Sequence, residues 1–217
     1  MSKPDYWDTA CHALSTADPV MGRIIAACGS AHLVSRGDPF LTLARSIVGQ
    51  QISVKAAQAV WDRVVKAARD MTPDRVCRMR VSTLRGCGLS ERKVEYVKDL
   101  AVRFRSGAID PAGWDDLDDD AIIDQLVEVR GIGRWTAEMF LMFNLMRPDV
   151  YPIDDLGLLR AIQVNYEGEG GYHPLPEPLQ GKPHRQRAIE IGDRWRPWRT
   201  VATWYLWRSL DPVPTEY

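Results

Sequence analysis

The sequence predicts an all-α fold. In most segments apolar residues recur at the three- and four-residue spacing of helices, for example over 40–48 and over 91–104, and runs that alternate apolar and polar residues are few. Prolines and glycines divide these segments into pieces of ordinary helix length. An apolar content of 45% in 217 residues, with eight tryptophans, is enough for a well-filled core in one large domain or two small ones.

Helices divided by turns are expected over the first third of the chain. Apolar residues have helical spacing over 6–28, and a further helix is predicted over 40–48. The serine at the start of 53–68 is a good N-cap for the next helix. Because Gln50 and Gln51 lie between these two helices, the helices meet at a corner that carries two amide side chains.

Three more segments lead to the middle of the chain. Thr72, followed by a proline, starts a helix, and the glycine-rich turn 86–90 separates it from a helix over 91–104. Residues 107–114 are predicted to form a loop. The next helix begins at the aspartates 118–120.

Two glycines, one residue apart, divide that helix from the following one. Gly131 and Gly133 interrupt helical spacing within 129–133, which predicts a tight turn between two helices. Glycine is needed where the backbone takes positive φ or approaches a partner closely. The stretch 136–143 is apolar on nearly all faces, as in a buried helix. The turn therefore opens a helix N-terminus, and the amide groups and helix dipole there suit a phosphate.

Two aspartates precede the next predicted helix. Residues 147–149 end the buried helix, a short extended piece follows, and Asp154 and Asp155 stand directly before a helix over 156–162. An aspartate at such a junction commonly caps the helix. We expect capping to be the role of Asp154.

The last third contains a loop and an aromatic segment. Residues 167–181, rich in glycine and proline, are predicted to be an exposed loop. Residues 195–207 combine tryptophans with arginines. Aromatic residues at helical spacing more often belong to a core than to a binding site, and we assign Trp195, Trp198 and Trp204 to packing.

The composition limits the cellular compartment and the cofactors that we expect for this protein. No apolar run is long enough to span a membrane and the N-terminus lacks the form of a signal peptide, so we expect a cytoplasmic, nucleoid-associated protein. The cysteines show no Cys-x-x-Cys pairing, and the four histidines form no ligand-spaced cluster, so neither a zinc site nor a disulfide framework is predicted. The cysteines are Cys11, Cys28, Cys77 and Cys87.

The distribution of charge is more informative than its sum. The net charge of −1 does not favour nucleic-acid binding, yet 110–124 holds seven aspartates without Lys or Arg, whereas 182–208 holds seven basic residues against Glu190 and Asp193. Such asymmetry permits a basic side that faces DNA and an acidic side that faces solvent.

Five motifs in order resemble the helix-hairpin-helix (HhH-GPD) DNA glycosylase superfamily, and within it the AlkA-like 3-methyladenine DNA glycosylase II group. The resemblance covers roughly 40–208. The motifs are the Gln-Gln corner at 50–51, the Gly-Leu-Ser pattern at 88–93, the glycine hairpin at 129–137, the Asp-Asp-Leu-Gly pattern at 154–157 and the Trp-x-Pro-Trp-Arg pattern at 195–199. We expect Lys93 of the second motif to be mainly structural.

The resemblance implies roles for single residues. It implies that Asp155 does the chemistry, that Trp207 stacks on an extruded base, and that Gln51 enters the duplex where that base has left. The AlkA enzyme has an apolar wedge at this position, whereas other branches use glutamine. If Gln51 instead satisfies backbone groups at the corner, as we expect for Gln50, its role is structural.

The hairpin would grip the DNA backbone. The DNA-binding residues implied there are Gly131, Gly133, Arg134 and Thr136. Trp135 and Met139 would line the base pocket with Trp207, although Trp135 also suits the core. Backbone carbonyls of Val127, Val129 and Ile132 would hold a structural monovalent cation, Na⁺ or K⁺, that takes no part in the chemistry.

The implied reaction is hydrolysis of an N-glycosidic bond. Enzymes that act on a base inside a duplex extrude it first. The breaking bond leaves positive charge on the sugar, which a fixed carboxylate such as Asp155 would stabilise. Alkylated purines, 3-methyladenine first and 7-methylguanine as a further substrate, are cationic leaving groups that need no general acid and that a π-rich pocket attracts. Bifunctional relatives have a lysine where this chain has Trp135, so a monofunctional enzyme that leaves an abasic site is expected.

The resemblance also implies an organisation. We expect a single glycosylase unit over 1–217 with its cleft between two lobes, one over about 40–150 with the hairpin 127–136, the other from 1–35 and about 151–217. It would be the compact form without the N-terminal β domain. No cysteine follows Cys87, so the iron–sulfur loop of some relatives is absent. The expected partner is double-stranded DNA with damaged bases, bound by a monomer that needs no cofactor for chemistry.

Two alternatives remain open. A glycosylase for a neutral damaged or mispaired base would need hydrogen-bond donors in its pocket, and none stands out near Met139. A hairpin protein that binds damage without cutting would not need Asp155 and Trp207.

Overall fold

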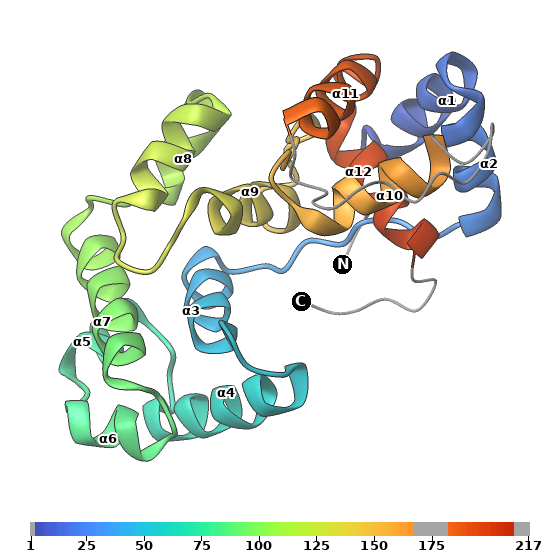
Figure 1. The fold of residues 1–217 in the computed structure, drawn as a ribbon. Coiled ribbons are helices and arrows are strands. Elements are labelled where there is room, and N and C mark those ends of the chain that lie inside the picture. Colours follow the sequence, from blue (N-terminus) through green and yellow to red (C-terminus); the bar gives the residue numbers. More distant parts are fainter. Residues whose placement is uncertain (1–2, 167–181, 211–217) are drawn as a thin grey trace. The chain divides into compact units, whose positions relative to one another are not determined.

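The computed structural model describes residues 3–166 and 182–210, and all regular structure in these residues is helical (Figure 1). This confirms the predicted all-α class. The helices are α1 Trp7–Ala17, α2 Pro19–Cys28, α3 Pro39–Gly49, α4 Val54–Ala68, α5 Pro73–Arg78, α6 Val81–Gly86, α7 Glu91–Ser106, the 3₁₀ helix η1 Pro111–Asp116, α8 Asp119–Val127, α9 Arg134–Phe143, α10 Leu156–Tyr166, α11 Lys182–Asp193 and α12 Arg199–Leu210. The loop predicted over 167–181 lies outside the described residues.

Side-chain caps start several helices where the sequence predicts them. Ser53 accepts a hydrogen bond from the amide of Ala56, and Thr72 accepts one from Arg75. The helix expected after Thr72 is two short helices, because the backbone is extended at Met79 and Arg80. Residues 107–114, predicted to be a loop, run into the 3₁₀ helix η1.

The chain divides into two compact units. Unit 2 is the continuous stretch 36–140, in which α7 packs against α3 and α5. Phe40 of α3 meets Phe104 of α7 edge to face with ring centroids 5.4 Å apart, and Trp114 meets Phe140 at 5.3 Å. The apolar face of α7 is therefore buried in the core of unit 2.

Unit 1 combines both ends of the chain, 1–35 and 141–216. Helix α12 is buried from Thr200 to Leu206 and contacts α1, α2 and α10. Asp18 joins the two segments, since its carboxylate accepts hydrogen bonds from Tyr166 at 2.7 Å and from the Trp195 indole at 3.0 Å. Over the described residues, no helix is both long and apolar enough to cross a bilayer.

Candidate functional site

Asp155 lies at the N-terminus of α10, half-buried. Its Oδ1 accepts a hydrogen bond from the amide of Leu158 at 2.7 Å, so the carboxylate caps the helix. Its own amide donates to the carbonyl of Pro152 at 2.9 Å. The turn after Pro152 therefore fixes both the backbone and the side chain of Asp155.

A tryptophan from the end of the chain contacts the same carboxylate oxygen. The indole Nε1 of Trp207 donates to Asp155 Oδ1 at 2.9 Å. The Trp207 ring stacks on Phe143 with centroids 6.0 Å apart and planes 12° from parallel. Unit 1 thus holds a fixed carboxylate beside two stacked aromatic rings, an arrangement suited to a cationic or electron-poor planar group.

Gly157 allows this close approach. A Cβ on Gly157 would lie 3.1 Å from Asp155 Oδ1 and 3.3 Å from Trp207 Cδ1, tighter than ordinary van der Waals contact. Sequence reasoning missed Phe143 as a neighbour of Trp207 and gave Gly157 no role. The signal for Phe143 was present, because Trp135, Met139 and Phe143 recur every four residues and so lie on one face of α9.

The expected role of Asp154 is wrong. The exposed Asp154 does not cap α10 but pairs with Arg185 of α11 at 3.0 Å. The N-cap is the residue directly before the first helical residue, Leu156, and that residue is Asp155. Capping and catalysis are therefore compatible roles for Asp155, because the cap holds the candidate catalytic carboxylate in place.

The glycine hairpin forms the turn between α8 and α9. The Ile132 amide donates to the Val129 carbonyl at 3.0 Å, and Gly131 has φ +85°. A Cβ on Gly131 would overlap the ring of Tyr96. Gly131 is therefore required by both backbone conformation and space.

Gly133 differs, because a Cβ there would meet open space and its φ lies outside the left-handed region. It directly precedes α9 and its carbonyl accepts from Ala137 at 3.0 Å. Neither turn geometry nor packing in the described residues requires glycine at this position.

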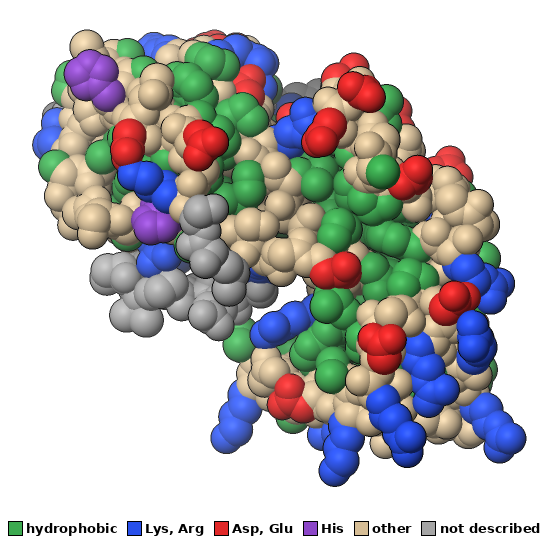
Figure 2. Space-filling view, turned by 180° about the vertical axis from the view of Figure 1, so that it is seen from behind, with side chains coloured by type: hydrophobic (Ala, Val, Ile, Leu, Met, Phe, Trp, Pro, Cys, Tyr) green, Lys and Arg blue, Asp and Glu red, His purple; other side chains and the backbone are tan. Residues whose placement is uncertain are grey.

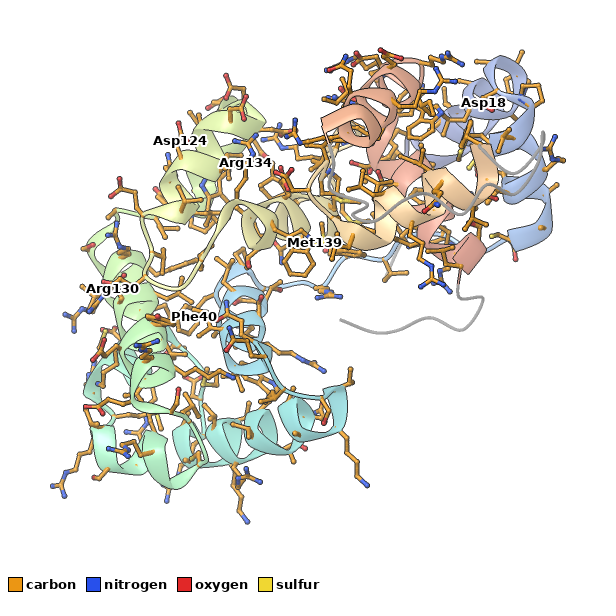
Figure 3. The ribbon with its side chains drawn as sticks, viewed as in Figure 1. Asp18, Phe40, Asp124, Arg130, Arg134 and Met139 are labelled. Atoms are coloured by element: carbon orange, nitrogen blue, oxygen red, sulfur yellow. The ribbon has the colours of Figure 1, made fainter. Side chains whose placement is uncertain are left out.

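Of the two polar residues expected to bind DNA here, Arg134 is paired and Thr136 is buried. Arg134 donates to Asp120 of α8 at 2.9 Å and to the buried Glu138 at 3.1 Å, and Figure 3 shows Arg134 directed towards α8. The hydrogen bond to Asp120 raises the pKa of Arg134 further. Thr136 is buried. The hairpin thus presents backbone amides of the first helical turn, which have no acceptor within the helix.

The carbonyls expected to hold a cation have different surroundings. Val127 is 40% exposed, whereas Val129 and Ile132 are buried residues of the turn. The Val129 carbonyl accepts one amide and retains a second lone pair. In the part of the chain that the structure describes, no cluster of three His, Cys, Asp or Glu side chains could hold a metal ion.

The corner between α3 and α4 is fastened to the hairpin. Gln50 Nε2 donates to the carbonyl of Gly131 at 2.8 Å, so Gln50 does bond a backbone group, but one in the hairpin rather than at its own corner. Lys93 Nζ donates to the carbonyls of Val48 and Gln50, each at 2.7 Å, so Lys93 is structural as predicted. Burial lowers the pKa of Lys93.

Gln51 stands at the apex of this corner, exposed and with φ +58°. Positive φ is unfavourable for a residue with a Cβ, and residues in sparsely populated conformations are frequent at functional sites. Trp135 on α9 is 44% exposed, which does not fit a core residue, and Met139 is half-buried.

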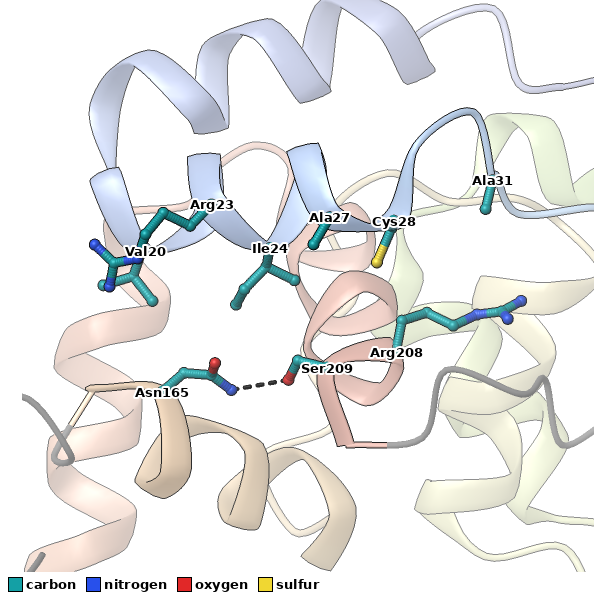
Figure 4. Close-up of a pocket in the computed structure, with 9 residues that line it drawn as sticks. All are labelled: Val20, Arg23, Ile24, Ala27, Cys28, Ala31, Asn165, Arg208 and Ser209. Carbon is teal, nitrogen blue, oxygen red and sulfur yellow. Dashed lines mark hydrogen bonds between the residues drawn. The ribbon is translucent and has the colours of Figure 1, made fainter.

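A hollow in unit 1 is not part of this arrangement. It measures about 490 Å³ and lies between α2, α10 and α12 (Figure 4). Its polar groups do not converge, because Arg23 and Arg208 point in opposite directions, while Asn165 and Ser209 bond to each other at 2.8 Å. A small-molecule site normally has polar groups that converge on its ligand.

The fold and these residues define a class of protein, in which a helical scaffold presents a helix-hairpin-helix turn and a carboxylate seated against aromatic rings. The sequence profile of the family described as "HhH-GPD superfamily base excision DNA repair protein" matches residues 44–170, more than half of the chain. The chain belongs to this family, as its motifs predicted.

Known relatives agree with this membership. The chain is 32% identical over 180 residues to the DNA-3-methyladenine glycosylase 1 of Schizosaccharomyces pombe, covering 81% of this chain and 74% of the relative. A crystal structure of a DNA-3-methyladenine glycosidase from Bacillus halodurans superposes with a TM-score of 0.82 at 32% identity, covering 96% of this chain and 92% of that one. A 3-methyladenine DNA glycosylase from S. pombe, in complex with abasic DNA, has a TM-score of 0.75 at 29% identity, with coverages of 93% and 96%.

Proposed function

We propose that this protein is a base-excision DNA glycosylase that hydrolyses the N-glycosidic bond of alkylated purines, 3-methyladenine foremost. The observation that carries the proposal is the placement of Asp155, whose carboxylate is fixed by the Leu158 amide and by the Trp207 indole. The relatives that share the fold and about a third of the sequence are named for this activity.

The chemistry follows from the fixed carboxylate. As the bond from the sugar to the base stretches, positive charge develops on the sugar, and a negative group held in place stabilises that charge without reorganising. Water then adds to the sugar and an abasic site remains. The stacked rings of Trp207 and Phe143 attract a purine that alkylation has made cationic, so the leaving group needs no proton from the protein.

The product follows from the residue at the start of α9. A strand-cleaving enzyme needs an amine that attacks the sugar, and the chain has Trp135 where bifunctional relatives carry a lysine. The exposed Trp135 and the half-buried Met139 lie on the same face of α9 as Phe143 and are proposed as further pocket residues.

The hairpin and the corner are proposed to hold the duplex. Backbone amides after Gly131 and Gly133 would bind a phosphate, with Arg134 and Thr136 contributing through the first turn of α9. The strained Gln51 would fill the gap left by the extruded base. The cation proposed at the carbonyls of Val127, Val129 and Ile132 would bridge to a phosphate, so DNA affinity should be lower in tetramethylammonium chloride than in potassium chloride.

The setting of the activity is also a proposal. We expect a monomer acting on double-stranded DNA in the cytoplasm or nucleoid, with no iron–sulfur cluster. The cysteines in the described structure are free, and the last of them, Cys87, lies in unit 2.

Release of bases from methylated duplex DNA tests the function. The wild-type protein should release 3-methyladenine, and Asp155→Asn should reduce the rate on the order of 10²-fold or more, since it removes the charge but keeps the size and the cap acceptor. Asp154→Asn is the matched control and should keep its activity. Release of no methylated base would leave the neutral-base and binding-only alternatives, and an active Asp155→Asn protein would show that another residue does the chemistry.

A further inference from the structure

The cations of unit 2 are gathered at the end that carries α4, α5 and α6. Residues 54–93 hold ten of the chain's 28 Lys and Arg but only four of its 29 Asp and Glu, a net charge of +6 in a chain whose net charge is −1. Figure 2 shows basic side chains outnumbering acidic ones over this end. The charge of unit 2 is therefore concentrated in a stretch that does not include the hairpin.

Six of these ten side chains have no partner among the described residues. All six are exposed, and among the residues that the structure describes none of them makes an ion pair or a side-chain hydrogen bond. We call them the α4–α6 basic surface, formed by Lys55, Lys66, Arg69, Arg80, Arg85 and Arg92. The other four hold the fold or pair locally, as Arg63 does by donating to the Cys87 carbonyl at 2.8 Å.

The hairpin end of unit 2 has fewer unpaired cations than the α4–α6 end. Two of its arginines are paired, since Arg103 meets Asp99 and Glu128, and Arg130 meets Glu95 and Asp99. Arg134 is also paired, and seven aspartates lie in 110–124. The hairpin can hold a phosphate through backbone amides, but it has few cations to displace counterions from DNA.

Helix geometry aligns part of the basic surface with the hairpin. Lys66 follows Lys55 by 11 residues, about three turns, so the two share a face of α4, and Arg69 follows directly at the C-cap of the helix. Asp62 lies on this face too, where it accepts from Gln58 at 2.7 Å. Helix α4, about 22 Å long, starts directly after the corner that Gln50 fastens to Gly131. These cations thus lie on the helix that follows the corner bonded to the hairpin.

We propose that the α4–α6 basic surface is a second DNA-contacting surface, which binds phosphates of undamaged duplex beside the lesion and supplies the salt-dependent part of DNA affinity. The inference rests on the proposed function for its partner. Lys and Arg side chains that neutralise phosphates release counterions, and this sequence-independent attraction lets a repair protein search a duplex. In this proposal the hairpin fixes the position of the protein on the DNA, and the basic surface provides the electrostatic attraction to the phosphates.

The test compares two triple variants of equal charge. Lys55→Gln/Lys66→Gln/Arg69→Gln, called the α4 variant, removes two cations of α4 and the one at its C-cap, and Arg105→Gln/Arg160→Gln/Arg187→Gln removes three exposed cations elsewhere. Binding to an undamaged 30-base-pair duplex is measured by fluorescence anisotropy over a series of KCl concentrations. The slope of log K against log salt should become shallower by about 2–3 in the α4 variant, because each neutralised phosphate accounts for roughly 0.9 of the slope. The control should change it by less than about 1.

Equal slopes in the α4 variant and the wild type, or equal changes in both variants, would overturn the proposal. Unchanged thermal unfolding verifies that both variants are folded. Release of 3-methyladenine is measured separately with the wild type. If the slope changes but no base is released, the proposed function is wrong and the DNA-contacting role of the basic surface is supported. If bases are released but the slope is unchanged, the proposed function is supported and the role of the basic surface is wrong.

Discussion

At the scale of single residues, the candidate site depends on one carboxylate oxygen with two donors. The Leu158 amide and the Trp207 indole both donate to Oδ1 of Asp155, at 2.7 and 2.9 Å. A hydrogen bond to a charged group contributes about 1.5–3 kcal/mol, so two of them hold the side chain in one orientation. Trp207 therefore has two separable features, an N–H group that orients Asp155 and a ring that stacks.

Trp207→Phe separates these features. Phenylalanine keeps an aromatic ring against Phe143 and loses the donor, so we expect the single-turnover rate of base release to fall about ten- to a hundredfold. Affinity for DNA should change little. The measurement is single-turnover release at saturating enzyme, with binding followed by anisotropy.

Trp198→Phe is the control, since Trp198 also stacks on an aromatic ring of unit 1, that of Tyr6, and is assigned to packing. If Trp207→Phe releases bases at the wild-type rate, the indole N–H does not orient the catalytic group.

At the scale of elements, the hairpin contains two glycines with different physical reasons. Gly131 has positive φ and lies against the ring of Tyr96, whereas Gly133 faces open space at the start of α9. Corner and hairpin form one assembly, because Gln50 bonds the Gly131 carbonyl and Lys93 bonds two carbonyls of the corner. Gly131 is thus needed for the fold. Glycine at position 133 is needed only if a partner such as a DNA phosphate approaches the backbone there.

Alanine at each glycine distinguishes these reasons. Gly131→Ala should destabilise the protein by about 1–3 kcal/mol or more, through backbone strain and displacement of Tyr96. Gly133→Ala should change the free energy of unfolding by less than about 1 kcal/mol, while it weakens DNA binding because its methyl group stands between the amides and a phosphate.

Urea unfolding and anisotropy with duplex DNA measure the two effects on the same preparations. A Gly133→Ala protein that binds DNA as the wild type does would remove the hairpin amides from the proposed interface.

At the scale of the whole molecule, unit 1 depends on contacts between the two ends of the chain. The buried Asp18 accepts from the amides of Val20 and Met21 as the cap of α2, and from Tyr166 and Trp195 in the second segment. Burial raises the pKa of Tyr166, so its hydroxyl stays protonated and donates. One side chain thus joins the N-terminal helices to the segments that carry Asp155 and Trp207.

Asp18→Ala tests this connection. It leaves four donors without their acceptor, and we expect the free energy of unfolding to fall by about 3–5 kcal/mol. Asp38→Ala, which removes the exposed cap of α3 in unit 2, should cost about 1 kcal/mol.

Urea unfolding followed by tryptophan fluorescence reports the difference, since Trp7, Trp195, Trp198, Trp204 and Trp207 all belong to unit 1. Equal losses in the two variants would mean that Asp18 acts as a cap and no more.

Four features were predictable from sequence alone: the helical class, the turn at 129–133, the cap at Ser53 and the family. These features depend on the local spacing of residues, because helix caps and tight turns involve residues within a few positions of one another. The family motifs are equally local, each spanning fewer than ten residues. The role of Asp155 follows from such a motif and stays a prediction until the base-release experiment is done.

Only the tertiary structure decided which side chains meet. Trp207 reaches Asp155 across 52 residues, and Arg134 is neutralised by Asp120 and Glu138. The assignment of the cap to Asp155 rather than Asp154 depended on a single-residue boundary, and helix boundaries are the least certain part of a pattern. Packing brings distant residues together through buried surface that no local spacing records, so the partners of a carboxylate or an arginine emerge only in the folded chain.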